Sequence, residues 1–193
     1  MPSEAPQQVS FIDPTTLRAI IRAIVTEQAE PVQSPNANVP APTVIAPGNY
    51  DGVHLGHQAL LRSATRFAQA HGLSTSVLTF NPHPGEFFGA TPKAVITLHP
   101  RRAELLHAAG ADRVYVQAFT QEFAALSPEA FIDALTARGA RALVVGPDFR
   151  FGAERRGDCQ LLEQLAKTRG FSVLVEPPVQ LDGERVSSSA IRL

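Results

Sequence analysis

The stretch Gly48–His57 reads Gly-Asn-Tyr-Asp-Gly-Val-His-Leu-Gly-His and lies between two contrasting patterns. A short apolar run, Thr43–Ala46, comes directly before it, and a helical pattern from Gly56 to His71 follows it. This order predicts a strand, a glycine-rich turn and the start of a helix. The backbone N–H groups at a helix start have no partner inside the helix, and the helix dipole makes that end positive. The junction is therefore suited to binding a phosphate group.

Two histidines, His54 and His57, lie three residues apart on the entering turn, which places them on one face of it. Imidazole donors in that position could stabilise the charge that builds on a phosphoryl oxygen as a leaving group departs. The glycines Gly48, Gly52 and Gly56 allow the backbone to approach a ligand closely or to adopt positive φ. Two ordinary surface histidines are the alternative interpretation, and the glycines and the strand-to-helix context favour the phosphate site.

Downstream of this stretch, apolar runs typical of strands alternate with helical patterns. The sequence predicts strands at 43–47, 75–80, 113–117, 142–146 and 171–176, and helices at 56–71, 100–109, 127–138 and 158–169. Such alternation indicates α/β architecture, with right-handed β-α-β units and a doubly wound parallel sheet between helices. Ligands in this architecture bind at the carboxyl ends of the strands, so the loops that follow the strands are expected to carry the chemistry.

The composition is that of a globular protein, with 44% hydrophobic and 18% charged residues among 193 and a net charge of −1. This charge gives no general attraction to nucleic acid or to an anionic membrane. The single cysteine, Cys159, excludes an intramolecular disulfide framework and a multi-cysteine zinc site. We find no secretory signal and no apolar stretch that could span a membrane. The sequence therefore predicts a cytoplasmic protein.

The N-terminal part is predicted to be an appendage. Residues 1–12 are polar and are expected to be flexible, an amphipathic helix is expected over 13–28, and residues 29–42 have the composition of a proline-rich linker. So short a helix is marginal alone in water, so its apolar stripe needs a partner. That partner could be its own domain or a second copy of the chain. It could also be a docking protein, because helix plus linker resembles the encapsulation peptides that direct enzymes into bacterial microcompartments.

Three later loops carry polar and aromatic side chains that could meet a ligand at the ends of the strands. The first is stiffened by the prolines of Asn81-Pro82-His83-Pro84, the second, Gly146–Gly152, flanks Arg150 with two phenylalanines, and the third places the hydroxyls of Ser187–Ser189 ahead of Arg192. Taken alone, each loop also has a plain structural interpretation. The first loop could be an ordinary rigid connection, the phenylalanines of the second could fill the core, and the hydroxyls of the third could cap a helix.

Together these stretches resemble motifs of the prokaryotic FAD synthetase (FMN adenylyltransferase) family within the nucleotidyltransferase superfamily. The similar motifs are His-x-Gly-His at 54–57, Thr-Phe-(Glu/Asn)-Pro-His-Pro at 79–84, Gly-x-(Asp/Asn)-Phe-x-Phe-Gly at 146–152, and Ser-Ser-Thr-x-x-Arg at 187–192, with Ser189 in place of the threonine. They occur in the family's order over about 150 residues. The resemblance implies a Rossmann-like nucleotidyltransferase domain over residues 43–193.

The resemblance also implies a reaction in which ATP and FMN are the substrates, Mg²⁺ is the cofactor, and FAD and pyrophosphate are the products. It implies that His54 and His57 stabilise the α-phosphate, and that Arg192 stabilises the departing pyrophosphate. ATP-binding roles follow for Gly48, Asn49, Tyr50, Asp51, Gly56, Ser187, Ser188 and Ser189, flavin-binding roles for Asn81, Pro82, His83, Asp148, Phe149 and Phe151, and a magnesium-binding role for Asp148.

Most members of that family carry a riboflavin kinase module after this domain, and the sequence stops where that module would begin. We therefore expect FMN adenylyltransferase activity without riboflavin kinase activity. Two alternatives stay open. One is a related nucleotidyltransferase with another phosphate acceptor, and the other is a catalytically weak flavin- or nucleotide-binding module that its N-terminal helix directs to an assembly.

Overall fold

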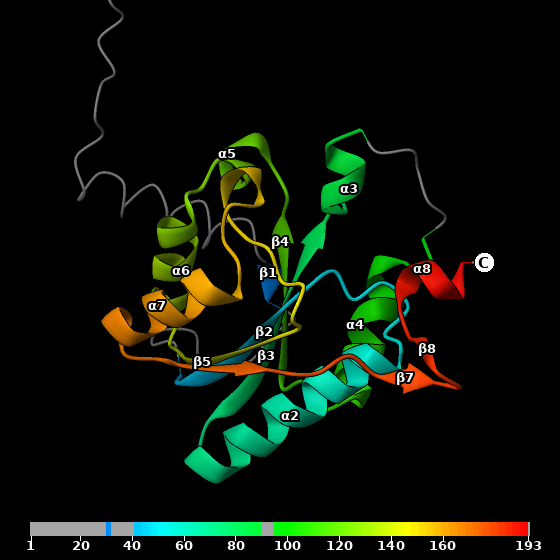
Figure 1. Cartoon of the computed structure of the whole chain (residues 1–193), viewed down its shortest axis with the longest axis horizontal. Coiled ribbons are helices and arrows are strands. Elements are labelled where there is room, and N and C mark those ends of the chain that lie inside the picture. The colour runs from blue at the N-terminus through cyan, green and yellow to red at the C-terminus, as the bar shows by residue number, and fades with distance from the viewer. Residues whose placement is uncertain (1–29, 32–40, 90–94, 193) are drawn as a thin grey trace, which may run out of the picture.

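The computed structural model describes residues 30–31, 41–89 and 95–192 (Figure 1). Its centre is a six-stranded sheet in the order β1-β4-β3-β2-β5-β6. The strands are β1 (Glu30–Pro31), β2 (Thr43–Pro47), β3 (Ser74–Asn81), β4 (Arg113–Ala118), β5 (Ala140–Val145) and β6 (Ser172–Val175). Strands β2 to β6 pair in parallel, whereas β1 runs antiparallel to β4. The five parallel strands confirm the predicted sheet, and the strand order reverses between β2 and β5.

Helices connect the parallel strands. The longer ones are α2 (Leu55–His71), α4 (His99–Ala108), α6 (Pro128–Ala137) and α7 (Cys159–Arg169), and the short ones are α3 (Pro84–Phe87), α5 (Gln121–Ala124), η1 (Ala153–Arg155) and α8 (Ser188–Ile191). A hairpin of β7 (Gln180–Leu181) and β8 (Glu184–Arg185) precedes α8. Among the helices of the described segments, none is both long enough and apolar enough to cross a membrane.

The sheet is buried on both faces, as the doubly wound arrangement requires. On one face, Leu61 of α2 and Leu106 of α4 pack against strand residues such as Val77. On the other face, Leu135 of α6 and Leu162 of α7 join the larger apolar cluster. Figure 1 shows α6 and α7 on the opposite side of the sheet from α2. Because helices cover both faces of the sheet, the carboxyl ends of the strands, where the loops begin, are the part that a ligand can reach.

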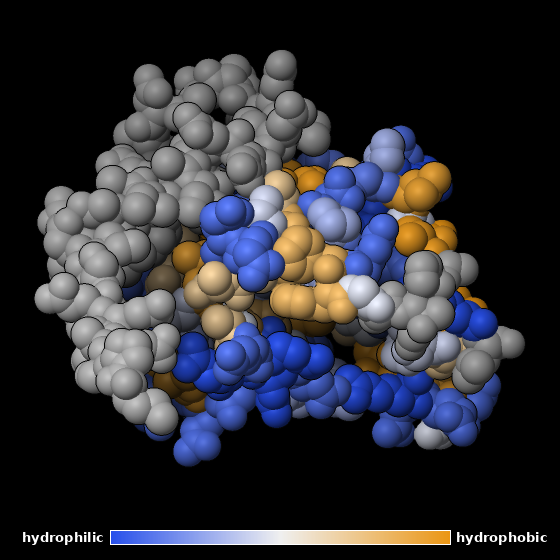
Figure 2. All heavy atoms as spheres, turned by 90° about the horizontal axis from the view of Figure 1, so that it is seen from above, coloured by the Kyte–Doolittle hydropathy of each residue, from blue (hydrophilic) through white to orange (hydrophobic). Residues whose placement is uncertain are grey.

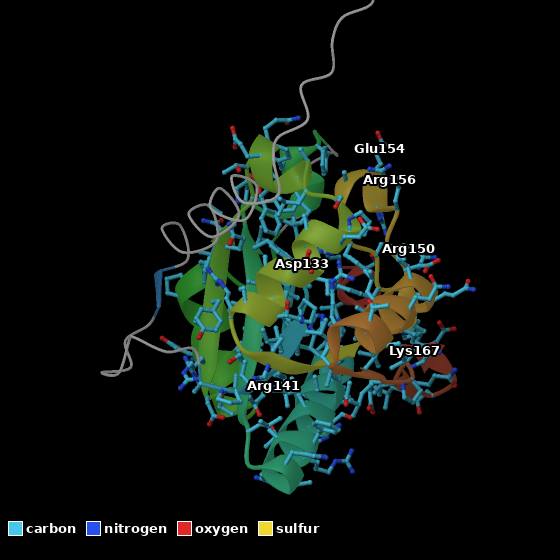
Figure 3. All side chains as sticks on the ribbon, turned by 90° about the vertical axis from the view of Figure 1, so that its left-hand side faces the viewer. Asp133, Arg141, Arg150, Glu154, Arg156 and Lys167 are labelled. Carbon is cyan, nitrogen blue, oxygen red and sulfur yellow. The ribbon has the colours of Figure 1, made fainter. Side chains whose placement is uncertain are left out.

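The outer sides of the helices that cover the second face are charged. Figure 3 shows Asp133 on α6 and Lys167 on α7, and Asp133 forms an ion pair with Arg169 at 2.5 Å. The residue before each of these helices caps it, because Ser127 accepts a hydrogen bond from the N–H of Ala130 and Asp158 accepts one from the N–H of Leu161. These caps begin α6 and α7 close to the predicted positions.

The N-terminal predictions fall mostly outside the described residues. Residues 1–12 and the helix expected over 13–28 are not described, so the proposed partners of that helix gain no support. Within the expected linker 29–42, Glu30 and Pro31 form β1 and pair with Val116 and Tyr115 of β4. The linker interpretation missed this strand because proline is unfavourable inside a sheet. Proline is tolerated in an edge strand, and β1 is one.

Candidate active site

A cleft of about 290 Å³ lies at the carboxyl ends of β2, β5 and β6, where the strand order reverses. This is the position that the sequence predicted from the alternation of strands and helices. Four segments line the cleft: His54, Gly56, His57 and Leu60 at the start of α2; Gly146 and Pro147 after β5; Glu176–Val179 after β6; and Arg185–Ser188 from the end of β8 to the start of α8. Figure 1 shows the hairpin β7–β8 beside the first turn of α2.

The two histidines of the first motif form a stacked pair. Their ring centroids are 3.6 Å apart and the ring planes are inclined by 19°. His54 is the N-cap of α2, and its Nδ1 accepts a hydrogen bond from the backbone N–H of His57 at 3.4 Å. Because Nδ1 is an acceptor, the neutral His54 ring carries its proton on Nε2. The N-cap contact thus fixes which ring atom can donate a hydrogen bond.

Both histidine rings are neutral at pH 7. Burial, as the largest cause, and the neighbouring His54 lower the pKa of His57 to about 3, although the charge of Asp51 works in the opposite direction. Burial, followed by the charge of Arg185, also lowers the pKa of His54. Two imidazolium rings in stacking contact would repel each other, which agrees with a neutral pair. The pair can therefore donate hydrogen bonds while remaining uncharged.

The turn that leads to His54 has a strained backbone. Tyr50 and Val53 have positive φ angles of 55° and 39°, and Gly52 has a φ of 87°. A positive φ is unfavourable for a β-branched residue such as valine, and such strain is concentrated at functional sites. A hydrogen bond from the N–H of Val53 to the carbonyl of Tyr50 closes this turn. Of these three residues, only Gly52 was expected from the sequence to adopt a positive φ.

Tyr50 faces the core. Its side chain is 1% exposed, and its hydroxyl donates a hydrogen bond to the carbonyl of Ala46 at 3.1 Å. The Tyr50 ring lies 4.9 Å from the ring of His57 and packs against it. The ATP contact expected of Tyr50 is therefore unavailable to its side chain, which instead supports His57. The ATP contact was predicted from the motif alone, whereas the depth of the turn in the fold places the Tyr50 side chain in the core.

Asp51 is also buried, with 3% of the residue exposed. Its carboxylate accepts hydrogen bonds from the backbone N–H groups of Ile96 at 3.0 Å and Thr97 at 2.9 Å. It forms an ion pair with Arg192 and lies 3.9 Å from the guanidinium of Arg102. Burial alone would raise the pKa of Asp51, but the hydrogen bonds and the two guanidinium charges together hold it below its ordinary value. The carboxylate is therefore ionised and fully engaged by protein groups.

Arg102 is a buried residue at this site that the sequence analysis did not predict. It is 5% exposed, and it donates hydrogen bonds to the carbonyl of Asn49 at 3.2 Å and to the carbonyl of Thr97 at 2.9 Å. Thr79 donates a further hydrogen bond to the Asn49 carbonyl at 3.1 Å. The peptide after Asn49 is thus held from two sides. In the sequence, Arg102 stands beside the exposed Arg101 at the start of a helix, and nothing distinguishes the two.

The serine motif begins the short helix α8. Ser187 caps it by accepting a hydrogen bond from the N–H of Ala190, and the Ser188 hydroxyl donates one to the main-chain carbonyl of Asp51 at 2.7 Å. Ser187 and Ser188 line the cleft together with the histidines, whereas Ser189 is exposed outside it. The guanidinium of Arg192 contacts the Asp51 carboxylate and the Ser188 carbonyl. Five of the residues predicted to contact the phosphates therefore line one cleft, namely His54, Gly56, His57, Ser187 and Ser188.

The first loop motif lies at the end of β3. The peptide between Asn81 and Pro82 is cis, and Nδ1 of His83 accepts a hydrogen bond from the N–H of Gly85 at 3.0 Å. Burial, as the largest effect, lowers the pKa of His83. Its neutral ring therefore carries the proton on Nε2, as in His54. This loop is outside the residues that line the cleft and leads directly into α3.

An aromatic group follows this loop, formed by Phe87, Phe88 and Phe119. Their ring centroids lie between 5.2 and 5.8 Å apart in edge-to-face arrangements. Phe88 is 66% exposed, although it belongs to this group. Figure 2 views the molecule from the side of α3 and α5 and shows apolar atoms exposed among hydrophilic ones on that face. An aromatic surface of this kind could stack on a planar ligand.

The loop after β5 divides into a core part and a surface part. Phe151 is 5% exposed and packs against Phe131 at 5.7 Å, so the flavin contact expected of Phe151 is unavailable to its side chain. A Cβ at Gly157 would lie 2.7 Å from the Phe151 ring, so Gly157 is required for this packing. Phe149 is partly buried and stacks on Phe151. The core interpretation of these phenylalanines therefore holds for Phe151.

The predicted magnesium ligand Asp148 is exposed, and it forms an ion pair with Arg185 at 2.5 Å. Within the described segments, no group of three or more histidine, cysteine, aspartate or glutamate side chains could hold a metal ion. The protein side chains alone therefore do not form a resident metal site there. Mg²⁺ is commonly bound by one or two carboxylates together with substrate phosphates and water. Asp148 fits that second kind of site.

Two segments of the cleft were not predicted as site residues. Glu176–Val179 follow β6 directly, and Arg185 ends β8. The rule that ligands bind at the carboxyl ends of strands would have indicated the first segment. Arg185 carries no comparable signal, because only the folded hairpin brings it to the cleft.

Fold and site together define an α/β nucleotide-binding domain. Residues 36–190 match the model of the FAD synthetase family. The chain therefore belongs to the FAD synthetase family, as its motifs predicted.

Two relatives share the name bifunctional riboflavin kinase/FMN adenylyltransferase. The chain is 39% identical to the one from Pseudomonas fluorescens over 147 residues, which are 75% of this chain and 47% of that protein. It is 40% identical to the one from Escherichia coli over 153 residues, which are 77% of this chain and 49% of that protein. A crystal structure described as a macrolide-efflux protein from Streptococcus pneumoniae has a TM-score of 0.71 and 28% identity, with coverage of 80% and 51%. The chain thus spans about half the length of the relatives it matches.

Proposed function

We propose that this domain is an FMN adenylyltransferase, which transfers AMP from ATP to FMN and forms FAD and pyrophosphate. A phosphate oxygen of FMN would attack the α-phosphorus of ATP, forming one P–O bond while the bond to the β-phosphate oxygen breaks. The observation that carries this proposal is the neutral, stacked pair His54 and His57 in the same cleft as Ser187 and Ser188. Membership of the FAD synthetase family supports the identity of the acceptor.

The protein would act mainly by positioning the substrates and stabilising charge, as phosphoryl-transfer sites do. The Nε2–H of His54 is available as a donor because its Nδ1 is engaged by the His57 N–H. Such donors would bind oxygens of the α-phosphoryl group, where negative charge develops. The hydroxyls of Ser187 and Ser188, with Arg185 and Arg192, would bind the pyrophosphate that leaves. No covalent intermediate with the protein is needed.

The flavin would lie against the aromatic group Phe87, Phe88 and Phe119, beside the loop that holds Asn81, Pro82 and His83. This placement is supported by the exposure of Phe88 and by the ring planes available for stacking. Asp148, which pairs with Arg185 in this structure, would hold Mg²⁺ together with the triphosphate oxygens. When bound, the ion supplies positive charge to the phosphate oxygens.

An experiment with several acceptors distinguishes this proposal from the related alternatives. The chain is incubated with ATP and Mg²⁺ and with either FMN, riboflavin, nicotinamide mononucleotide or phosphopantetheine, and both pyrophosphate release and the products, separated by chromatography, are followed. We expect release with FMN alone. Release with another acceptor but not with FMN would favour a different nucleotidyltransferase, and a phosphorylated product from riboflavin would refute the prediction that the chain has no kinase activity.

A binding module without turnover is the less favoured alternative. That alternative depended on Arg192 being poorly held so close to the end of the sequence. In the structure, Arg192 forms an ion pair with the buried carboxylate of Asp51 and contacts the Ser188 carbonyl. This fixed position supports turnover.

Replacing Gly56 with alanine should lower the rate without unfolding the domain. A Cβ at this position would lie 3.2 Å from two atoms of the His54 ring, so the ring would have to move. A displacement of that kind should lower kcat for FAD formation by about 10- to 100-fold. The helical backbone accepts alanine, so the unfolding temperature should stay close to that of the unchanged chain. A variant that keeps full kcat would show that the position of the His54 ring is unimportant.

Replacing Phe88 with alanine should weaken FMN binding and leave ATP binding unchanged. Loss of a stacking partner and its apolar contact should raise the Kd for FMN by about tenfold, measured by quenching of flavin fluorescence. Leu98→Ala is the matched control, because Leu98 is also highly exposed, at 72%, and lies at the start of α4. Equal effects of the two substitutions on FMN binding would contradict the proposed flavin position.

A further inference from the structure

We propose that Asp51 is a positioning residue of the proposed reaction, whose carboxylate holds Arg192 and thereby helix α8, at whose start the cleft residues Ser187 and Ser188 lie. The expected fall in kcat rests on the proposed function. The expected loosening of α8 rests on geometry alone. This positioning role replaces the role first expected of Asp51, which was a direct contact with ATP. Four observations on the described residues lead to it.

The first observation is that Asp51 joins segments that are far apart in the sequence. Its carboxylate binds the N–H groups of Ile96 and Thr97, 45 and 46 residues away, and the guanidinium of Arg192, 141 residues away. Its main-chain carbonyl accepts the hydroxyl of Ser188 at 2.7 Å. One residue of the glycine-rich turn therefore contacts the loop before α4 and both ends of α8.

The second observation is the size of α8, which has only four residues. A helix of one turn is not stable by itself, so contacts with the rest of the fold must fix its position. Ser188 and Arg192 bind Asp51 from the two ends of this turn. Because Ser187 and Ser188 line the cleft, the contacts of Asp51 determine where their hydroxyls lie.

The third observation is burial. The Asp51 side chain is 4% exposed, and the side chains of Arg102 and Arg192 are 6% and 19% exposed. A buried charge pair fixes geometry closely, because removing one partner leaves the other charge without compensation. The Asp51 carboxylate is shielded from solvent and can therefore hold Arg192 in one orientation.

The fourth observation is the sign of the charges. A carboxylate in direct contact with a triphosphate would bring two negative groups together, which is unfavourable. Asp51 instead faces two guanidinium groups, so the three side chains together carry one positive charge. That excess charge would still attract the phosphates while Arg192 remains oriented by Asp51.

Asp51→Asn tests this role, because asparagine keeps the volume and one acceptor oxygen for the N–H groups of Ile96 and Thr97 while removing the charge. We expect kcat for FAD formation to fall about 100-fold while the KM for FMN stays within about twofold. Asp133→Asn is the matched control, since it breaks the exposed ion pair with Arg169 and should change neither constant.

A double-mutant cycle separates positioning from a direct role. If Asp51 acts through Arg192, the variant D51N combined with R192A should be no more than about twofold slower than R192A alone. If the losses of kcat in D51N and R192A multiply in the double variant, the two residues act independently and the proposal is overturned. So would a D51N variant in which the KM for FMN rises and kcat stays the same.

A structural measurement keeps this inference separate from the proposed reaction. Hydrogen exchange followed by mass spectrometry should show faster exchange in residues 187–192 of D51N than in D133N, by more than any increase in the strands β2 and β5 of the same variant. If D51N does not fold, Arg192→Gln serves instead, because it removes the ion pair with the Asp51 carboxylate at its more exposed partner. Unchanged exchange in these residues would overturn the proposal. Absence of FAD formation by the unchanged chain, with the exchange effect present, would refute only the proposed reaction.

Discussion

Alanine at position 57 should lower kcat for FAD formation by about 100- to 1,000-fold, which is the range for loss of one donor that stabilises developing charge. The His57 ring stacks on His54 at 3.6 Å and packs against Tyr50 at 4.9 Å, so its loss removes a donor and also the support of a second one. Because burial lowers the pKa of His57 to about 3, the lost interaction is that of a neutral ring. Steady-state kinetics with saturating FMN and ATP measures the effect.

His71→Ala is the control for this substitution. His71 lies in the last turn of the same helix and is exposed, and it should be replaced without loss of kcat. Unfolding temperatures of both variants show whether the helix remains folded. If His57→Ala retained more than a tenth of the original kcat, the histidine pair would not be the main source of charge stabilisation.

Removing divalent cations should abolish FAD formation, and adding Mg²⁺ should restore it. The described side chains include no cluster that could hold a metal by itself, so the ion would be held jointly by the triphosphate and Asp148. The chain without nucleotide should then bind Mg²⁺ only weakly, with a Kd in the millimolar range by isothermal titration calorimetry. Tight Mg²⁺ binding to the chain alone would show a resident metal site, and FAD formation in excess EDTA would show that no metal is required.

The parts of the fold that depend on local pattern could be predicted from the sequence. The five parallel strands and four longer helices appear where the periodicity indicated, because burial on one face of a helix or on both faces of a central strand leaves a direct trace in the residue order. The turn at Gly48–His57 was evident for the same reason, since glycines, histidines and the flanking elements are contiguous. Strand β1 left no such trace, because Pro31 lies in a segment with the composition of a linker.

The parts of the site that depend on contacts between distant residues could not be predicted. Arg102 and Arg101 look alike in the sequence, but only Arg102 lies beneath the turn, where Asn49 and Thr97 accept its hydrogen bonds. Phe151 belongs to a motif associated with ligand binding and is nevertheless part of the core. The contact of Asp51 with Arg192 spans 141 residues, and no spacing rule connects the two. The motifs therefore predicted where the site lies, whereas the role of each side chain depends on contacts that only the folded chain makes.

Transfer of AMP to FMN in this cleft can be measured directly. The most direct measurement incubates the chain with FMN, ATP and Mg²⁺ and quantifies FAD by chromatography together with pyrophosphate. We expect equal amounts of FAD and pyrophosphate, both lost in His57→Ala. Binding of ATP and FMN without formation of either product would contradict it.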